Sequence, residues 1–320
     1  MRSPVLFLVF NRPETTKRVF ESIRSARPPR LYIAADGPRR TRPKEAEKCA
    51  EVRMIVASVD WPCEVRTLYQ DENLGCKRGV VTGINWFFEN EEEGVILEDD
   101  VLPCQSFFSY CDELLERYRF DQRIGVVSGC NLIASKFVTP NSYFFSRYNH
   151  VWGWASWRRA WKFYDSDMKE WPKIREQGLL KKISCGSKCF ELYWRKIFDD
   201  VYAGKIDTWD YQWTFACWRY GILAVLPKYN QTENIGFGRG ATHTNFETPR
   251  YIRESAPLQL NFPLQHPVSI ELCFTADKVI DKYVFQITVL KEMRQKIRNI
   301  YFIGPMFVRI WRAINKIMAN

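Results

Sequence analysis

A nearly continuous apolar run close to the amino terminus constrains the fold more than any other segment. Residues 4–10 read Pro-Val-Leu-Phe-Leu-Val-Phe, with little alternation of apolar and polar side chains. Such a run is typical of a strand that is buried on both faces in a parallel sheet. Pro13 suits the first position of a helix, and Val19 and Ile23 follow at helical spacing. The segment therefore predicts a strand and then a helix, the first unit of an α/β fold.

The alternation of strand and helix repeats over the first 130 residues. Further strands are predicted at residues 31–35, 64–69, 95–97 and 124–128, with helices beginning near Pro43, after Asn73-Leu74-Gly75 and near Ser106. This order predicts a Rossmann-like, mixed but mostly parallel sheet with helices on its faces. Ligands of such sheets bind at the carboxyl ends of the strands.

Composition and cysteine spacing are those of an ordinary folded protein inside the cell. The 320 residues are 46% hydrophobic and 26% charged, enough for one large domain or two modest ones. The ten cysteines include no C-x2-C pair, and the first apolar run is too short for a signal peptide or a membrane span. We therefore expect reduced thiols and a cytoplasmic location.

Three adjacent carboxylates, Glu98, Asp99 and Asp100, follow the apolar residues 94–97. In an extended chain Glu98 and Asp100 point the same way and Asp99 points opposite. Carboxylate oxygens at a strand end suit Mg²⁺ or Mn²⁺ held between a protein and a diphosphate. The alternative is a solvated acidic turn, since three glutamates at 91–93 precede the triplet.

Polar residues also follow the first two predicted strands, as Asn11-Arg12 and Asp36-Gly37. An arginine can neutralise a diphosphate, and an aspartate can accept hydrogen bonds from a nucleobase or ribose. The alternatives are a surface charge for Arg12 and a turn former for Asp36. Together with the acidic triplet, these strand ends predict a binding site for a phosphorylated ligand.

The second half of the chain changes character. It is rich in tryptophan between Trp152 and Trp218, which suits either sugar stacking or a large aromatic core. Asp207 and Asp210 stand among aromatic residues, where burial can raise a carboxyl pKa enough for general-base work. A helix cap is the alternative for Asp210. Residues 234–244 are rich in glycine, as expected of a loop that closes over a ligand or of a plain surface connection.

In this order the segments resemble a nucleotide-sugar glycosyltransferase family of the GT-A fold. The family includes the GlcNAc-transferases that initiate complex-type N-glycan branching and related bacterial enzymes. The resemblance covers about residues 4–250. It rests on Val9-Phe10-Asn11-Arg12, Ala34-Ala35-Asp36, Glu98-Asp99-Asp100 with Phe107-Phe108, Gly153-Trp154, Trp209-Asp210, and Gly236-Phe237-Gly238-Arg239-Gly240-Ala241-Thr242-His243.

The resemblance implies a role for each matching residue. Asp100 is the implied ligand of Mn²⁺ or Mg²⁺, and Asp210 is the implied catalytic base. Donor or nucleotide contacts are implied for Asn11, Arg12, Asp36, Glu98, Asp99, Arg239 and His243, and acceptor-side positions for Gly153, Trp154 and Trp209. The family has two adjacent acids where this chain has Asp210-Tyr211, which leaves Asp207 as an alternative base.

The implied activity is metal-dependent, inverting transfer of a sugar from a nucleotide-diphosphate donor. The resemblance favours a UDP-sugar, with UDP-GlcNAc as the first candidate, and a hydroxyl of a glycan or lipid-linked acceptor in surface polysaccharide or glycoconjugate assembly. We divide the chain into a donor-binding half, residues 1–103, an acceptor-binding and catalytic half, residues 104–265, and a basic amphipathic helical tail, residues 266–320.

The tail suggests contact with a membrane. Residues 291–316 carry seven basic groups and one acid, and apolar residues recur at helical spacing after Pro305. A helix over 305–320 is too short to span a bilayer but suits an interfacial position on anionic lipid at the cytoplasmic face. Packing on the domain or on a second subunit is the alternative.

Two other functions compete with this interpretation. A sugar-nucleotide nucleotidyltransferase usually has a glycine-rich, arginine-containing loop directly after the first strand, where this chain has Asn11-Arg12-Pro13-Glu14. A noncatalytic carbohydrate- or nucleotide-binding protein on a degenerate GT-A fold is the second. Nucleic acid is disfavoured as a partner, because the acidic triplet would repel a polyanion at that site.

Overall fold

The structure, a computed structural model, describes residues 1–237 and 249–288. Within these ranges a central sheet and a separate strand pair contain ten strands. They are β1 Val5–Val9, β2 Arg30–Ala35, β3 Glu64–Tyr69, β4 Glu93–Glu98, β5 Val101–Pro103, β6 Ile124–Ser128, β7 Tyr143–Ser146, β8 Trp154–Trp157, β9 Leu223–Pro227 and β10 Thr232–Asn234.

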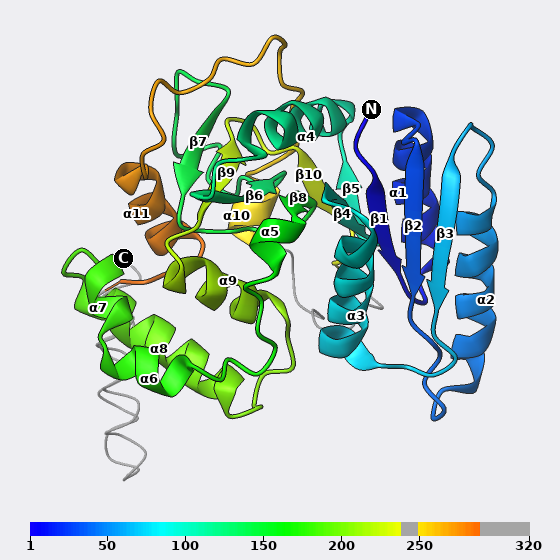
Figure 1. The fold of residues 1–320 in the computed structure, drawn as a ribbon, viewed down its shortest axis with the longest axis horizontal. Helices are drawn as coiled ribbons and strands as arrows, with labels where there is room; N and C mark the ends of the chain where they lie inside the picture. The colour runs from blue at the N-terminus through cyan, green and yellow to red at the C-terminus, as the bar shows by residue number, and fades with distance from the viewer. Residues whose placement is uncertain (238–248, 289–320) are drawn as a thin grey trace, which may run out of the picture.

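The central sheet has eight strands in the order β3-β2-β1-β4-β8-β6-β9-β7. β3, β2, β1 and β4 are parallel neighbours, and β6 and β9 are also parallel to each other. β8 runs antiparallel between β4 and β6, and β7 is antiparallel to β9. The predicted mixed, mostly parallel sheet is therefore confirmed (Figure 1). β5, which directly follows the acidic triplet, forms a separate antiparallel pair with β10.

Eleven helices are described. They are α1 Pro13–Ala26, α2 Pro43–Ala57, α3 Gly75–Asn90, α4 Gln105–Tyr118, α5 Arg158–Trp161, α6 Trp171–Glu176, α7 Leu179–Ile183, α8 Lys188–Tyr202, α9 Asp210–Arg219, α10 Arg250–Arg253 and α11 Phe274–Tyr283. α1 and α2 begin with proline, whose fixed φ suits the first turn and whose missing N–H is not needed there.

The two faces of the sheet are covered by different helices, because alternate side chains of each strand enter different cores. Phe7 of β1 packs in one core with apolar residues of α1, α2 and α4. Leu8 packs in the other with residues of α3, α5, α8 and α9. The second core holds most of the buried tryptophans. The arrangement is a sheet with helical layers on both faces (Figure 1).

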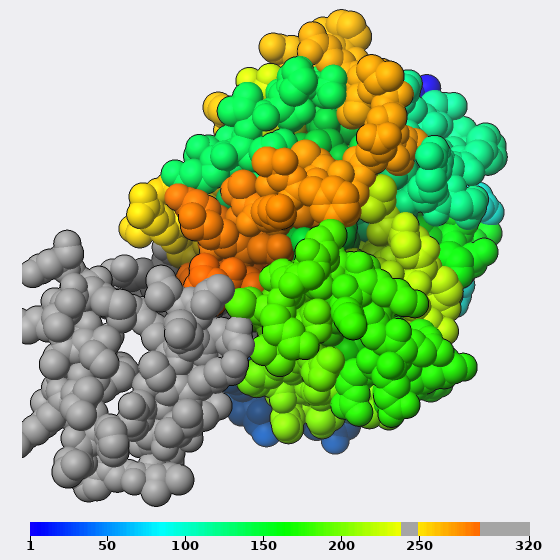
Figure 2. Space-filling view, turned by 90° about the vertical axis from the view of Figure 1, so that its left-hand side faces the viewer, coloured from blue at the N-terminus to red at the C-terminus, as the bar shows by residue number. Residues whose placement is uncertain are grey.

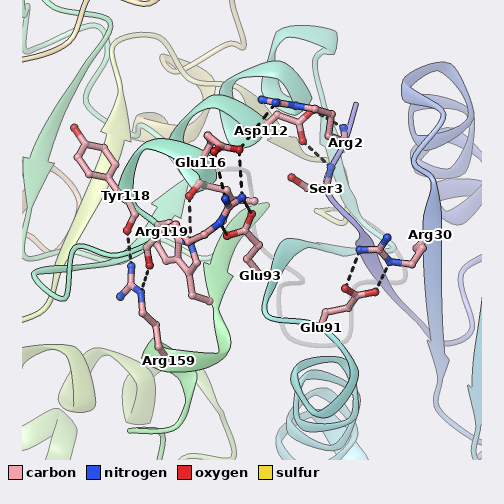
Figure 3. Close-up of polar contacts among 12 residues, drawn as sticks. Arg2, Ser3, Arg30, Glu91, Glu93, Asp112, Glu116, Tyr118, Arg119 and Arg159 are labelled. Carbon is pink, nitrogen blue, oxygen red and sulfur yellow. Dashed lines mark hydrogen bonds and ion pairs between the residues drawn. The ribbon is translucent and has the colours of Figure 1, made fainter.

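Ion pairs tie the elements together at the amino end of β4, the end remote from the acidic triplet. Arg119 pairs with Glu93 at 2.6 Å, and Arg30 pairs with Glu91 (Figure 3). Arg159 donates to the carbonyl oxygen of Tyr118 at 2.7 Å. These contacts hold α4, α5, β2 and β4 in place and leave the carboxyl ends of the strands available for a ligand.

Residues 266–288 of the predicted tail pack on the domain. Arg147 pairs with Asp277 and Asp281, which both lie on α11. α11 lies beside the surface formed by α6, α7 and α8 (Figure 2). The predicted membrane-binding segment, residues 305–320, lies outside the described residues. No helix in the described part of the chain is both long and apolar enough to cross a bilayer.

Candidate functional site

A cavity of about 350 Å³ opens at the carboxyl ends of β1, β2 and β4, where doubly wound sheets bind their ligands. We call it the acidic cavity, because five carboxylates and two arginines are its charged lining among the described residues. They are Asp36, Glu98, Asp99, Asp100 and Asp207, with Arg12 and Arg39. The structure thus brings together the polar residues that the sequence places at the ends of three separate strands.

All three acids of the triplet line this cavity, which corrects the expectation that Asp99 points away from its neighbours. β4 ends at Glu98 and the chain turns at Asp99 and Asp100, so strand alternation does not extend to them. The Arg12 guanidinium lies 3.6 Å from Asp99 and hydrogen-bonds to Asp100. Asp99 also accepts the Phe10 N–H at 3.0 Å.

The crowded carboxylates perturb one another. Burial raises the pKa of Glu98, and the charges of Asp100 and Asp99 raise it further. Burial and the charge of Asp100 likewise raise the pKa of Asp99. Burial disfavours the charged form of Arg12, but the charges of Asp99 and Asp100 outweigh this effect and raise the Arg12 pKa. The carboxylates of the cavity therefore outnumber the positive charges that could balance them.

Asp36 lines the acidic cavity while its carboxylate organises the loop that leads into α3. It accepts hydrogen bonds from the N–H groups of Gly37 and Leu74 and from the side-chain amide of Asn73, at 2.8 to 2.9 Å. Burial raises the Asp36 pKa, and the backbone donors oppose that shift. Gly37 has no substitute here, since a Cβ atom would lie 2.5 Å from the Glu72 backbone. These contacts agree with the alternative role of Asp36, that of a turn former, and they occur at a position that lines the cavity.

Asn11 is not part of the cavity lining. Its side-chain amide donates to Glu45 of α2 at 2.8 Å, and the same carboxylate accepts from Arg39 Nε at 2.9 Å. Arg39 lines the cavity and lies over the Phe10 ring. Asn11 therefore contacts the cavity only indirectly: it holds Glu45, and Glu45 in turn holds Arg39 of the cavity lining. Arg39 is not among the residues predicted from the sequence, although it lies three residues after Asp36 at the same strand end.

The glycine-rich segment begins directly against the acidic triplet. The N–H of Ile235 donates to the Asp100 carbonyl oxygen at 2.7 Å, and Gly236 follows beside the Asp100 side chain. Phe237 then packs edge-on against Trp152 with ring centroids 6.0 Å apart. Arg239 and His243 lie outside the described residues.

The donor atoms of the acidic cavity suit a hard divalent cation. In the described part of the chain no group of three or more His, Cys, Asp or Glu side chains is arranged to hold a metal ion. A cation bound together with a diphosphate needs only one or two carboxylates, because phosphate oxygens and water complete its shell. Asp100 and its crowded neighbours offer such oxygens, and a cation would relieve their repulsion. The residues present fit a metal shared with a ligand.

A second cavity, of about 170 Å³, lies near the acidic one, and we call it the aromatic cavity. Its rings are those of Tyr148, His150, Trp152, Trp194, Tyr211, Tyr251 and Phe285. Asp210 also lines it, accepting a hydrogen bond from Thr208. Burial raises the pKa of Asp210, and the Thr208 hydroxyl opposes that shift.

Asp207 and Asp210 therefore serve different cavities: Asp207 lines the acidic one and Asp210 the aromatic one. The charge of Asp210 nevertheless contributes to the raised pKa of Glu98. Asp210 thus stands close to the acidic cavity while it faces the aromatic one.

Trp154 and Trp209, for which the resemblance implies acceptor-side positions, are buried core residues. Both are at most 4% exposed, and their rings stack at 5.9 Å. Neither lines either cavity, whereas Trp152 lines the aromatic one. Gly153 lies between Trp152 and Trp154 in the sequence and has a φ of +69°, a conformation that favours glycine. Trp209 directly precedes Asp210, the first residue of α9, so the stacking of Trp209 on Trp154 helps to position Asp210.

No protein-family model and no curated protein sequence matches the chain. Among solved structures, the UTP-bound UGPase from Acinetobacter baumannii is 9% identical, with a TM-score of 0.37 over 73% of this chain and 89% of its own. HddC from Yersinia pseudotuberculosis is 9% identical, with a TM-score of 0.31 over 49% of this chain and 78% of its own. Similarity at this level establishes no shared activity, and it gives the resemblance to GlcNAc-transferases no support.

Proposed function

We propose that this protein is a metal-dependent, inverting glycosyltransferase. Its donor is a nucleotide-diphosphate sugar, with UDP-GlcNAc as the first candidate. The acceptor is a hydroxyl of a glycan or lipid-linked glycan in surface polysaccharide or glycoconjugate assembly. The observation that carries the proposal is the position of Asp210. It is a half-buried carboxylate that lines the aromatic cavity, and its charge acts on Glu98 of the acidic cavity.

The acidic cavity suits the donor. In this proposal Arg12 contacts the diphosphate, Asp36 contacts the nucleobase, and Glu98 and Asp99 face the donor sugar and the ribose. Asp100 is the residue that would hold Mn²⁺ or Mg²⁺. Five carboxylates against two arginines would repel a diphosphate unless a cation entered with it, which is why we propose metal dependence. A bound divalent cation supplies charge stabilisation for the departing diphosphate.

The proposed reaction is then a single displacement of the diphosphate at the anomeric carbon of the donor. The Asp210 carboxylate takes the proton of the acceptor hydroxyl while that oxygen attacks the anomeric carbon. The bond from that carbon to the diphosphate oxygen breaks, and the configuration inverts. The raised Asp210 pKa makes it a stronger base than an exposed aspartate. Asp207, on the donor side, is the alternative base.

The link between β1 and α1 disfavours the nucleotidyltransferase alternative. β1 ends at Val9 and α1 begins at Pro13, which leaves only three residues between them. Such a link has no room for the long glycine-rich loop that we expect of that class.

The test compares the two chemistries in the full chain. UDP-sugars are incubated with Mn²⁺ and a glycan acceptor, and UTP is incubated with sugar 1-phosphates and Mg²⁺. We expect glycosylated product in the first case, and the Asp100→Ala variant should lose both this product and the Mn²⁺-dependent rise in melting temperature with UDP. Pyrophosphate release from UTP without any glycosyl transfer would replace the proposal with the nucleotidyltransferase.

A further inference from the structure

The aromatic cavity contains polar groups that the described residues leave without a hydrogen-bond partner. They are Asn149 Nδ2, His150 Nε2 and Trp194 Nε1. Asn149 is 6% exposed and Trp194 is 1% exposed, so both side chains are more than nine-tenths buried. A buried polar group without a hydrogen-bond partner destabilises the folded state. Three such groups around one cavity call for an explanation, and a polar ligand provides one.

Both buried and partly exposed rings line the cavity. Tyr148 and Trp194 are buried, and each packs against Phe285 at a centroid distance of 5.0 Å. Tyr211 and Tyr251 are partly exposed. Aromatic walls with a few fixed polar groups are typical of sites for small organic molecules. This combination suits a sugar ring, which has apolar C–H faces and a polar rim.

The charge and size of the cavity further limit the class of ligand that it can bind. Among the described residues no lysine or arginine lines it, and Asp210 is its one carboxylate. Burial lowers the pKa of His150 to about 4, so this imidazole is neutral at physiological pH. An anionic ring would meet Asp210 with no compensating cation. A volume of about 170 Å³ is below the ~300 Å³ at which cavities for drug-sized ligands begin, which favours one ring over several.

We propose that the aromatic cavity binds one uncharged, hydroxylated ring, the terminal sugar residue of the acceptor, with a hydroxyl directed at Asp210. The ring's identity as an acceptor rests on the proposed glycosyl transfer, whereas its binding does not. The cavity selects neutral sugars over uronic acids and phosphorylated sugars, because no basic side chain in the described lining balances a second negative charge.

The test measures binding without catalysis. Methyl glycosides of glucose, galactose, mannose and N-acetylglucosamine, and methyl glucuronide, are titrated into the full chain by saturation-transfer NMR. We expect at least one neutral glycoside to bind with a millimolar Kd and the glucuronide to bind at least tenfold more weakly. Tyr251→Ala should weaken the neutral glycoside at least tenfold, or 1.4 kcal/mol. Tyr251→Phe keeps the ring and should bind as the wild type does.

Tyr202→Ala is the matched control, because Tyr202 is half-exposed on α8 and lines neither cavity. Failure of every neutral glycoside to bind, equal binding of the glucuronide, or unchanged binding in Tyr251→Ala would each overturn the inference. Stabilisation by UDP and Mn²⁺ is measured on the same samples. If UDP and Mn²⁺ still stabilise the protein while no glycoside binds, the proposed acceptor site is wrong and the proposed donor site is retained. If glycosides bind and UDP does not, the proposed transfer fails and the sugar cavity stands.

Discussion

Gly236 packs so closely against Asp100 that a Cβ atom at position 236 would overlap the Asp100 carboxylate. The contact follows from strand pairing, because Asn234 of β10 lies opposite Val101 of β5, the residue after Asp100. The first residues of the glycine-rich segment and the last acid of the triplet are thereby held side by side. The position of the Asp100 carboxylate therefore depends on the absence of a side chain at position 236.

Gly236→Ala should displace the Asp100 carboxylate, because the Asp100 side chain is the nearest group to the added methyl. We expect at least tenfold weaker activation by Mn²⁺, with the fold retained. The measurement is the metal dependence of transfer, together with the Mn²⁺-dependent melting shift with UDP. Glu233→Ala, an exposed change on the same strand β10, is the control. Metal activation equal to wild type in Gly236→Ala would show that Asp100 does not hold the cation.

Asp210→Asn separates the two candidate bases. Loss of a general base costs about 10²–10⁴-fold in rate, so kcat should fall by that factor while UDP binding stays unchanged. Asp207→Asn alters the wall of the acidic cavity and should change the KM for the donor more than kcat. Steady-state kinetics on both variants give the answer. The reverse pattern, a large kcat loss in Asp207→Asn alone, would move the base to Asp207.

The free energy of unfolding should fall with rising pH because of Glu98. A salt-bridged acid, whose pKa is lowered, has the opposite effect. The pKa of Glu98 is raised in the folded protein, first by burial and then by Asp100 and Asp99. The folded state therefore binds a proton more tightly than the unfolded state, and stability falls as pH rises through the ordinary carboxyl range toward the raised pKa. Glu98→Gln removes this penalty, so its melting temperature should exceed the wild type's by about 2 °C or more at alkaline pH.

The Glu98→Gln difference should shrink as the pH falls and disappear below the ordinary carboxyl range, where the wild-type side chain is protonated in both states. Differential scanning fluorimetry across the pH range, without added metal, measures it. Glu14→Gln, an exposed change on α1, should show no such trend. A stability gain that is the same at every pH would assign the effect to packing instead of charge.

Cys76 offers a reporter for the acidic cavity, which it lines. Cys76 is exposed to solvent, but desolvation of its thiol and the charges of Glu98 and Asp210 raise its pKa to about 12, so alkylation by a neutral maleimide should be slow. UDP with Mn²⁺ should slow it further by covering the thiol. Peptide mass spectrometry measures the labelling, with the exposed Cys185, which lies outside this cavity, as the internal control. Equal labelling of Cys76 with and without UDP would place the nucleotide elsewhere.

Trp152 and Trp154 should respond differently to substitution. Trp154 is 1% exposed, so Trp154→Ala should cost about 3–5 kcal/mol of stability through the cavity that it leaves. Trp152→Ala should unfold at nearly the wild-type denaturant concentration and weaken binding of the neutral sugar, because Trp152 lines the aromatic cavity. Chemical denaturation and the glycoside titration distinguish the two. A stable Trp154→Ala protein with lost sugar binding would instead assign Trp154 a direct role in sugar binding.

The order of strands and helices up to residue 128 was predictable because it depends on local patterns. The run over residues 4–10 and the helical spacing up to Ile23 each identify an element without knowledge of its neighbours. The strand ends were predictable for the same reason. Arg12, Asp36 and Asp100 follow apolar strands, and parallel strands bring their carboxyl ends to one edge.

Other features depend on contacts between distant segments. Arg39 reaches the cavity only because Glu45 and Asn11 hold it, and no periodic pattern reports such a chain of hydrogen bonds. Trp152 and Trp154 differ by two positions, a spacing that puts both on one face of a regular strand. The positive φ of Gly153 breaks that regularity and sends one ring to the cavity and the other to the core.

The sequence alone therefore determined the α/β architecture and the chemical character of the strand ends, since both follow from local periodicity and residue type. The tertiary structure decided which carboxylate serves which cavity. Asp207 and Asp210 are three residues apart, yet they line different cavities. The reason is that α9 begins at Asp210, and the packing of Trp209 on Trp154 fixes where that helix starts in space.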